Sequence, residues 1–258
     1  MAQYRVTALY YKFRSENAQD LFDEAAPLSG TIGSFDFRLD QGILTATPNV
    51  EFRDRQAARD AIEPLLRDWE QSAFVTPYAY RIRFDYERSD VEEVDPQPGA
   101  VTVFPETIVV KAGLSANATI VRSNPKYPGL DTAFVRTPVT DRLTERLRRL
   151  RDREAELPAI AYVVLDTLEH EFGGTGSRRR NAAQALAVDE AVLDRLGALS
   201  SRADPDIGRK GGGDPTPLTP LEQRWIEEVI VRLIRRVGEH AAGATLAPIS
   251  MSDFTALP

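Results

Sequence analysis

The chain contains no cysteine and only two histidines among its 258 residues. Without cysteine it cannot carry a disulfide framework, a thiolate zinc site or a cysteine nucleophile. It also lacks a long apolar run, since the densest, from Leu157 to Leu165, is far shorter than the roughly 18 residues of a membrane span. We therefore expect a cytoplasmic protein with no membrane partner and no cofactor.

Positive charge is also scarce overall, because 32 lysines and arginines face 39 aspartates and glutamates, for a formal net charge of -7. A chain of this charge does not coat nucleic acid through its overall field. Its arginines nevertheless cluster in the C-terminal half, in the runs Arg142–Arg153, Arg178–Arg180 and Arg232–Arg236. A local basic patch is therefore still open, although the acids within the first run indicate a solvated helix face.

Common catalytic and metal motifs are missing as well. Gly173 to Ser177 looks like a phosphate-binding loop, but it follows a predicted helix and has no lysine followed by serine or threonine at the required spacing. His170 and Glu171 begin like a zinc protease motif, yet Gly174 stands where the second histidine belongs. No Gly-x-Ser-x-Gly occurs. We expect no metal site.

The N-terminal part has the patterns of β-strands. Aromatic and β-branched residues from Tyr4 to Phe13 favour a strand, and a short helix is expected over Ala18–Ala26. Gly30–Arg38 and Ile43–Phe52 are two further extended segments, joined by a turn at Gly42. This order is typical of an antiparallel meander.

One amphipathic helix is expected within this β-rich part. Apolar residues recur at helical spacing over Arg53–Gln71, where Pro64 should kink or restart the helix. Apolar and polar residues then alternate over Tyr78–Tyr86, the strongest strand pattern in the chain. We interpret its aromatic face as core covered by the helix; an exposed base-stacking platform is the alternative. The acidic stretch Asp90–Pro98 predicts a connection, and Val101–Arg122 predicts more strands.

Beyond residue 138 the patterns are helical. Thr140 is the expected N-cap of the first helix, and the second, Leu157–Phe172, is apolar nearly all round, which predicts the buried centre of a bundle. Two more helices are expected over Ser177–Leu186 and Asp189–Leu199. The last runs over Thr219–His240 and begins with a Thr-Pro-Leu-Glu capping box.

Together these patterns predict an α+β protein with two domains. We expect a β-rich domain with a covering helix over residues 1–138, with a sub-boundary at 90–98, and an all-α helical bundle over 139–242. Residues 243–258 are expected to form a tail.

The final helix carries the residues of greatest chemical interest. Its apolar stripe should face inward, while Arg232, Arg235 and Glu239 point away. At about 100° per residue, His240 lies about 40° from Arg236, which is its natural neighbour. Arginine and histidine in a last turn also complement the helix dipole, which is the purely structural interpretation.

A helical domain that ends in Arg235, four residues and His240 resembles the HEPN superfamily, whose hallmark is arginine, four to six residues and histidine. The resemblance implies a homodimer, formed through the helical domain, that cleaves RNA without metal. His240 would then assist proton transfer, and Arg235 would stabilise the charged phosphate, with Arg236 as the third candidate catalytic residue. Arg236 departs from the family, in which a small polar residue commonly follows the arginine. The expected RNA-binding residues are Arg178, Arg179, Arg180 and Arg232.

Two functions of different classes follow from these observations. The first is a HEPN-like RNA-binding or RNA-cleaving effector in stress or phage defence, with RNA as its partner. The second is a non-enzymatic module whose helical bundle assembles with a protein partner and whose arginines are ordinary surface. The mutual placement of Arg235, Arg236 and His240 distinguishes between the two.

Overall fold

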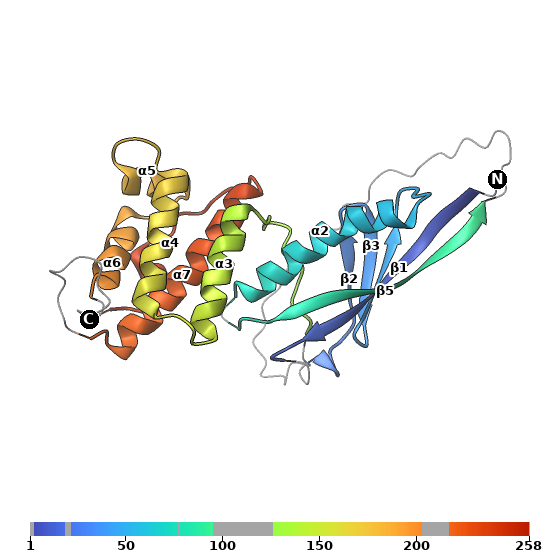
Figure 1. Cartoon of the computed structure of the whole chain (residues 1–258), viewed down its shortest axis with the longest axis horizontal. Helices are drawn as coiled ribbons and strands as arrows, with labels where there is room; N and C mark the ends of the chain where they lie inside the picture. Colours follow the sequence, from blue (N-terminus) through green and yellow to red (C-terminus); the bar gives the residue numbers. More distant parts are fainter. Residues whose placement is uncertain (1–2, 19–21, 77, 95–125, 203–216, 258) are drawn as a thin grey trace, which may run out of the picture. The chain divides into compact units, whose positions relative to one another are not determined.

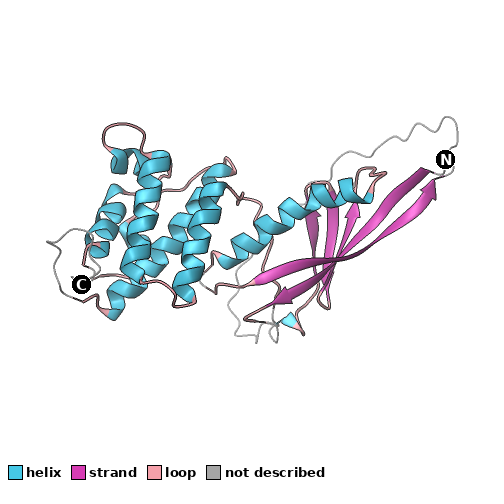
Figure 2. Ribbon diagram, viewed as in Figure 1, coloured by secondary structure: helices cyan, strands magenta, loops and turns pink. Residues whose placement is uncertain are grey.

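The computed structural model describes residues 3–18, 22–76, 78–94, 126–202 and 217–257. The chain divides into two compact units, one formed by Met1–Leu66 and Ile82–Gly129 and the other by Arg67–Arg81 and Leu130–Pro258. The first is β-rich and the second helical (Figure 1, Figure 2), which confirms the predicted α+β class. The units divide the chain after Leu66, Arg81 and Gly129 rather than at the expected residue 138, and α2 (Arg55–Phe74) contributes to both.

A five-stranded antiparallel sheet forms the β-rich unit, in the order β2-β3-β4-β1-β5. Its strands are β1 (Gln3–Ser15), β2 (Leu28–Ile32), β3 (Phe35–Asp40), β4 (Ile43–Pro48) and β5 (Ile82–Val94). Alternate residues of the central strands are buried on the face that the first half of α2 covers (Figure 1). That half of the helix contributes Ala58, Ile62 and Leu66, each at most 1% exposed, to the core.

The segment predicted as a single strand over Gly30–Arg38 is instead a hairpin. β2 ends at Ile32, and β3 begins at Phe35 after a turn in which Gly33 has a φ of +55°. A Cβ atom at Gly33 would lie 2.6 Å from the side chain of Leu65 on α2. The turn therefore needs glycine both for its left-handed backbone and for the close approach of the helix.

β5 lies later in the chain than its aromatic alternation predicts. Tyr78 precedes the strand and is 74% exposed, whereas Ile82 and Phe84 are buried in the core, as predicted. The strand continues to Val94, so the predicted connection is wrong over residues 90–94, whereas residues 95–98 lie outside the described residues. Residues 90–94 pair with β1. Acidic residues are rare in strands, so composition alone predicts a loop for this segment.

Helix α2 runs unbroken through Pro64, so the predicted restart of the helix is wrong. Pro64 lies on the exposed side of the helix, and so does Asp60, whose carbonyl loses its N–H partner. Water can hydrate that carbonyl, which allows the helix to tolerate the missing hydrogen bond.

Several predicted elements fall outside the described residues. The strands expected within Val101–Arg122 lie there, as do parts of the helix expected over Ala18–Ala26 and of the loop over Ser200–Pro217. Among the helices described, none combines the length and apolarity that a membrane crossing requires.

The helical unit is built from the second half of α2 and the helices that follow residue 137. In the described part of the chain these are α3 (Pro138–Arg151), α4 (Leu157–Phe172), α5 (Arg178–Ala185), α6 (Glu190–Ser200) and α7 (Pro220–Ala241). α4 contacts each of the other four, and its inward side chains Ile160, Val164 and Leu168 are at most 4% exposed. The predicted bounds of α4 and its central place are therefore confirmed.

The N-cap of α3 is Thr137 rather than the predicted Thr140. Pro138 occupies the first helical position, where a missing N–H costs nothing, and it holds Thr137 extended, with φ -137° and ψ 163°. Thr140 instead closes a capping box, in which each threonine hydroxyl accepts the other's backbone N–H, at 2.7 and 3.1 Å. The capping box predicted for α7, between Thr219 and Glu222, is confirmed.

Residues 243–257, which were expected to form a tail, pack against the helical unit. Ile249 is 1% exposed and pairs with Val188 in a parallel bridge. Further along, the ring of Phe254 meets that of Trp225 edge-on, at a centroid distance of 5.9 Å. The segment belongs to the helical core although it lacks the periodicity of a helix or strand.

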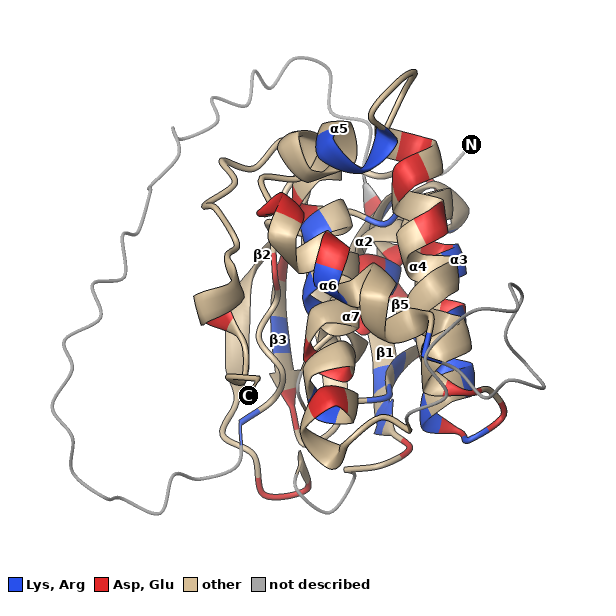
Figure 3. Ribbon diagram, turned by 90° about the vertical axis from the view of Figure 1, so that its left-hand side faces the viewer, with Lys and Arg blue, Asp and Glu red and all other residues tan. Residues whose placement is uncertain are grey.

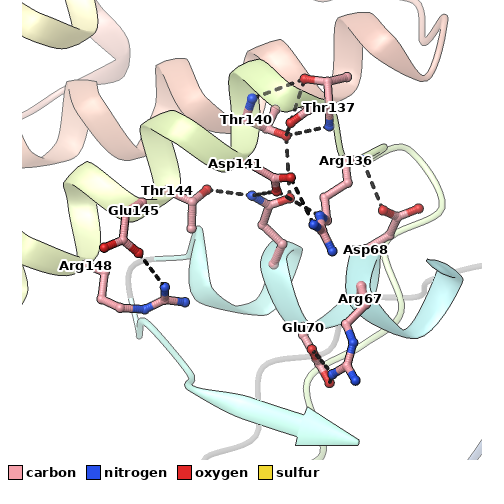
Figure 4. Close-up of polar contacts among 11 residues, drawn as sticks. Arg67, Asp68, Glu70, Arg136, Thr137, Thr140, Asp141, Thr144, Glu145 and Arg148 are labelled. Carbon is pink, nitrogen blue, oxygen red and sulfur yellow. Dashed lines mark hydrogen bonds and ion pairs between the residues drawn. The ribbon is translucent and has the colours of Figure 1, made fainter. Parts of the chain in front are cut away.

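A buried polar network joins the second half of α2 to α3 (Figure 4). Gln71 Nε2 donates to Thr144 Oγ1 at 2.8 Å and to Asp141 Oδ1 at 3.2 Å, and Thr140 donates to Gln71 Oε1 at 3.5 Å. Arg136 completes the network with two hydrogen bonds to the carboxylate of Asp141, at 2.8 and 2.9 Å. Gln71 and both threonines are buried, so these bonds take the place of water.

Replacing Gln71 by alanine should lower the free energy of unfolding by about 1–3 kcal/mol, because the buried hydroxyls of Thr140 and Thr144 would lose a partner. Urea denaturation of the purified protein measures this difference. Gln56→Ala is the matched control, since Gln56 is exposed and bonds to Asp60 on the same helix. Equally small changes in both variants would contradict the stabilising role of the network.

Glu222, in the first turn of α7, should affect stability in acid. Its carboxylate accepts hydrogen bonds from the backbone N–H of Thr219 at 2.9 Å and from Arg202 Nη1 at 2.8 Å. The Thr219 N–H is the largest cause that holds the pKa of Glu222 below its ordinary value. A lowered folded-state pKa stabilises the protein above the unfolded-state pKa of about 4.3, and this contribution is lost as pH falls through the folded value. Glu222→Gln should therefore flatten the fall in unfolding free energy below about pH 4.3.

Urea denaturation over a pH series measures this effect of Glu222. Glu227→Gln is the control, because Glu227 is an exposed residue of the same helix. A wild-type acid limb that runs parallel to that of Glu222→Gln would contradict the assignment.

Candidate functional site

The C-terminal end of α7 carries the three predicted catalytic residues, and Arg235 is held there by two carboxylates. Its Nη2 donates to Asp131, and its Nε donates to Glu239 Oε1 at 2.9 Å. Arg236 forms an ion pair with the same Glu239 at 3.3 Å. The guanidinium groups of Arg235 and Arg236 therefore face the carboxylates of Asp131 and Glu239, so both arginines already have an anionic partner.

Arg236 is buried rather than exposed at a reaction centre. It is 1% exposed, and its Nη2 donates to the carbonyl oxygen of Ala247 at 2.8 Å. Burial lowers the pKa of its guanidinium, and the carboxylate of Glu239 opposes that shift. Arg236 anchors the C-terminal segment to α7 and is inaccessible to a substrate, contrary to its predicted catalytic role.

His240 is exposed, so the predicted pairing of its ring with the buried Arg236 is not formed. The imidazole meets the ring of Phe172 on α4 edge-on, at a centroid distance of 5.4 Å. Within the described residues no hydrogen bond or ion pair fixes the imidazole. It therefore lacks the orienting partner that selects the tautomer of a catalytic histidine.

The end of α7 holds the segment that precedes α3. The backbone N–H of Val135 donates to the carbonyl of Gly238 at 3.2 Å, and a Cβ atom at Gly238 would lie 2.3 Å from the ring of Phe134. Asp131, at the start of this segment, is the residue that holds Arg235. The residues from Arg235 to Gly238 therefore have packing and pairing roles that do not depend on catalysis.

The predicted RNA-binding arginines are divided between ion pairs and solvent. Arg179 bonds to carboxylates of α4 and α6, and Arg180 bonds to a carboxylate of α6. Arg178 and Arg232 are exposed, and their side chains form no hydrogen bond or ion pair with the described residues. Basic and acidic residues are interspersed over the helices (Figure 3), so much of the guanidinium charge is balanced locally.

Sequence reasoning missed a groove of about 200 Å³ between α3 and α4. It is lined by Arg142, Leu143, Glu145, Arg146, Arg149, Val163 and Thr167. Its three arginines are spaced four and three residues apart, which places them on one face of α3. The sequence shows that spacing, but it does not show the neighbouring helix that converts a solvated face into a groove.

The arginines of this groove, which we call the α3–α4 groove, are not fully neutralised. Glu145 accepts hydrogen bonds from Arg148 Nη1 at 2.8 Å and from Arg149 Nε at 3.4 Å, and Arg142 is paired with a carboxylate at the end of α4. Arg146 is exposed, and its side chain has no hydrogen bond or ion pair within the described part of the chain. Three arginines and one carboxylate, that of Glu145, line the groove, and Arg148 and Glu171 pair with these residues from outside it, so positive charge exceeds negative charge among them.

The α3–α4 groove suits part of a large anion better than a small-molecule cofactor. Pockets that enclose small molecules have volumes of about 300–1,000 Å³, and this groove is smaller. Guanidinium groups recognise phosphate through paired N–H donors. Within the described residues no cluster of three or more histidines, aspartates or glutamates is placed to hold a metal ion.

Replacing Gly238 by alanine should lower the free energy of unfolding by about 1–3 kcal/mol, because the new methyl group would overlap the ring of Phe134. Urea denaturation measures the loss. Gly129→Ala is the matched control, since a Cβ atom there meets no atom within 4 Å. Full retention of stability in Gly238→Ala would contradict the structural account of this end of α7.

Comparison of the chain with known protein families, with described proteins and with solved structures finds no match. The HEPN resemblance therefore rests on the pattern from Arg235 to His240 at the end of a helical unit. Of the two surfaces described above, the end of α7 is balanced in charge, and the α3–α4 groove is basic and accessible.

Proposed function

We propose that the helical unit binds RNA, with backbone phosphates lying in the α3–α4 groove. The observation that carries this proposal is the guanidinium of Arg146, which has no partner among the described residues and lies between Arg142 and Arg149 on one face of the helix. Local positive charge can attract a polyanion even on a chain whose net charge is -7. Among polyanions we propose RNA, because the resemblance to the HEPN superfamily implies an RNA ligand.

The geometry of the three arginines supports an extended anion. Arg142 and Arg149 are seven positions apart, which is about 10.5 Å along the helix axis. A row of this length follows a strand of linked phosphates better than it surrounds a single ion. Each phosphate contact releases counterions, so binding should weaken as salt concentration rises.

RNA binding is proposed in preference to RNA cleavage because the arginines at the end of α7 are already paired or buried. Cleavage would need an imidazole and a guanidinium at one phosphate, but Arg235 is committed to Asp131 and Glu239. His240 offers an exposed imidazole without a free arginine from the same motif. A homodimer in which a second copy brings a cation to His240 would supply what is missing, and a cleavage assay tests it.

Arg146→Ala should weaken the binding of a short, fluorescently labelled single-stranded RNA about three- to tenfold, as expected for the loss of one charge-assisted contact. The slope of log K against log salt should also fall by about 0.7, the contribution of one phosphate on a single strand. Fluorescence anisotropy at several salt concentrations measures both quantities. Arg224→Ala is the control, because Arg224 is exposed on α7 and forms no ion pair with the described residues.

The same proteins decide among the alternatives. An absence of RNA binding by the wild-type chain, or equal losses in Arg146→Ala and Arg224→Ala, would contradict the proposal. RNA cleavage in the presence of chelator that disappears in His240→Ala would replace binding by a nuclease function at the end of α7. Binding of poly-glutamate instead of RNA, weakened by Arg146→Ala, would assign the α3–α4 groove to an acidic protein partner.

A further inference from the structure

We propose that Glu145 competes with RNA for Arg149, and that Arg148 sets the strength of this competition. The inference rests on the proposed RNA binding. Glu145 lines the α3–α4 groove, and its two oxygens have different partners: Oε2 accepts from Arg148 at 2.8 Å, and Oε1 accepts from Arg149 at 3.4 Å. The difference in distance makes Arg148 the firm partner and Arg149 the loose one.

A phosphate would be held between Arg146 and Arg149. These residues are three positions apart on α3, so their Cβ atoms lie about 5–6 Å apart, and both guanidinium groups can reach one phosphate. Arg146 is free, and the terminal nitrogens of Arg149 form no hydrogen bond within the described residues. An arriving phosphate therefore has to break one long hydrogen bond, the contact of Arg149 Nε with Glu145.

Arg148 is not among the residues that line the groove, yet its ion pair with Glu145 determines how strongly that carboxylate holds Arg149. While Arg148 holds the carboxylate, Arg149 can turn to a phosphate without leaving an unpaired charge behind. Arg148 is itself positioned by Phe74, whose ring centroid lies 5.4 Å from the guanidinium carbon. Removal of Arg148 would leave Arg149 as the partner of Glu145 among the described residues, and the carboxylate would compete more strongly.

A double-mutant cycle in RNA affinity tests this coupling. Glu145→Gln should raise the affinity about two- to fivefold, the range expected for one exposed ion pair. Arg148→Gln should lower it by a similar factor, although Arg148 does not touch the RNA. In the Glu145→Gln background the Arg148→Gln change should have little effect, because no carboxylate remains to be released. Arg148→Lys, which keeps a cation beside Glu145, should restore most of the affinity.

The control for net charge is Glu227→Gln, which makes the same change in charge on α7 and should leave the affinity unaltered. Unfolding curves of each variant establish that the fold survives the lost contact between Arg148 and Phe74. Independent effects of the two substitutions, with RNA binding by the wild type intact, would overturn the coupling and leave the proposed function standing. Failure of the wild type to bind RNA would overturn the proposed function itself.

Discussion

The burial of one face of α7, from Trp225 to Val237, constrains the rest of the helical unit. Its inward apolar side chains, each at most 2% exposed, are Trp225, Ile226, Val229, Ile230, Leu233, Ile234 and Val237. Burial of one such side chain contributes about 1.5–3 kcal/mol, which outweighs any single polar contact at either end. Glu222 and Arg236 are therefore carried inward and take backbone partners, and Gly238 leaves room for Phe134. Packing fixes the arginine end of the motif and leaves His240 exposed.

Charge pairing explains why a few arginines differ from the rest. Exposed arginine-carboxylate pairs contribute about 0–1 kcal/mol each, and they cancel the field that a distant anion would experience. Among the described residues the side chain of Arg146 has no partner, and that of its neighbour Arg149 has a single hydrogen bond of 3.4 Å. An incoming phosphate therefore gains most and displaces least at this point of α3. The proposed anion binding therefore depends on guanidinium groups that lack a close carboxylate among the described residues, rather than on the arginine-histidine pattern.

Prediction from sequence succeeds here where the signal is local. The apolar run of α4 with its glycine stop, and the capping box of α7, fix those helices without reference to neighbours. The N-cap of α3 was also predictable, because Pro138 holds Thr137 extended. β5 is different, since only pairing with β1 shows that its acidic end is a strand. The α3–α4 groove could not be predicted, because no local pattern shows where α4 packs against α3. The burial of Arg236 could not be predicted either, because its partner Ala247 lies in a segment without a periodic pattern.

The small number of arginines in the α3–α4 groove limits what one helical unit can bind. Three contacts to a single strand correspond to a slope of about -2 in log K against log salt. Two of the three arginines already have carboxylate partners, so a phosphate exchanges an existing ion pair at those positions and gains less there. Binding of this kind is weak and reversible, and it becomes strong only when several such surfaces engage one RNA. If the helical unit binds RNA as proposed, the few arginines of the α3–α4 groove should therefore favour long or multiply engaged RNA over isolated phosphates.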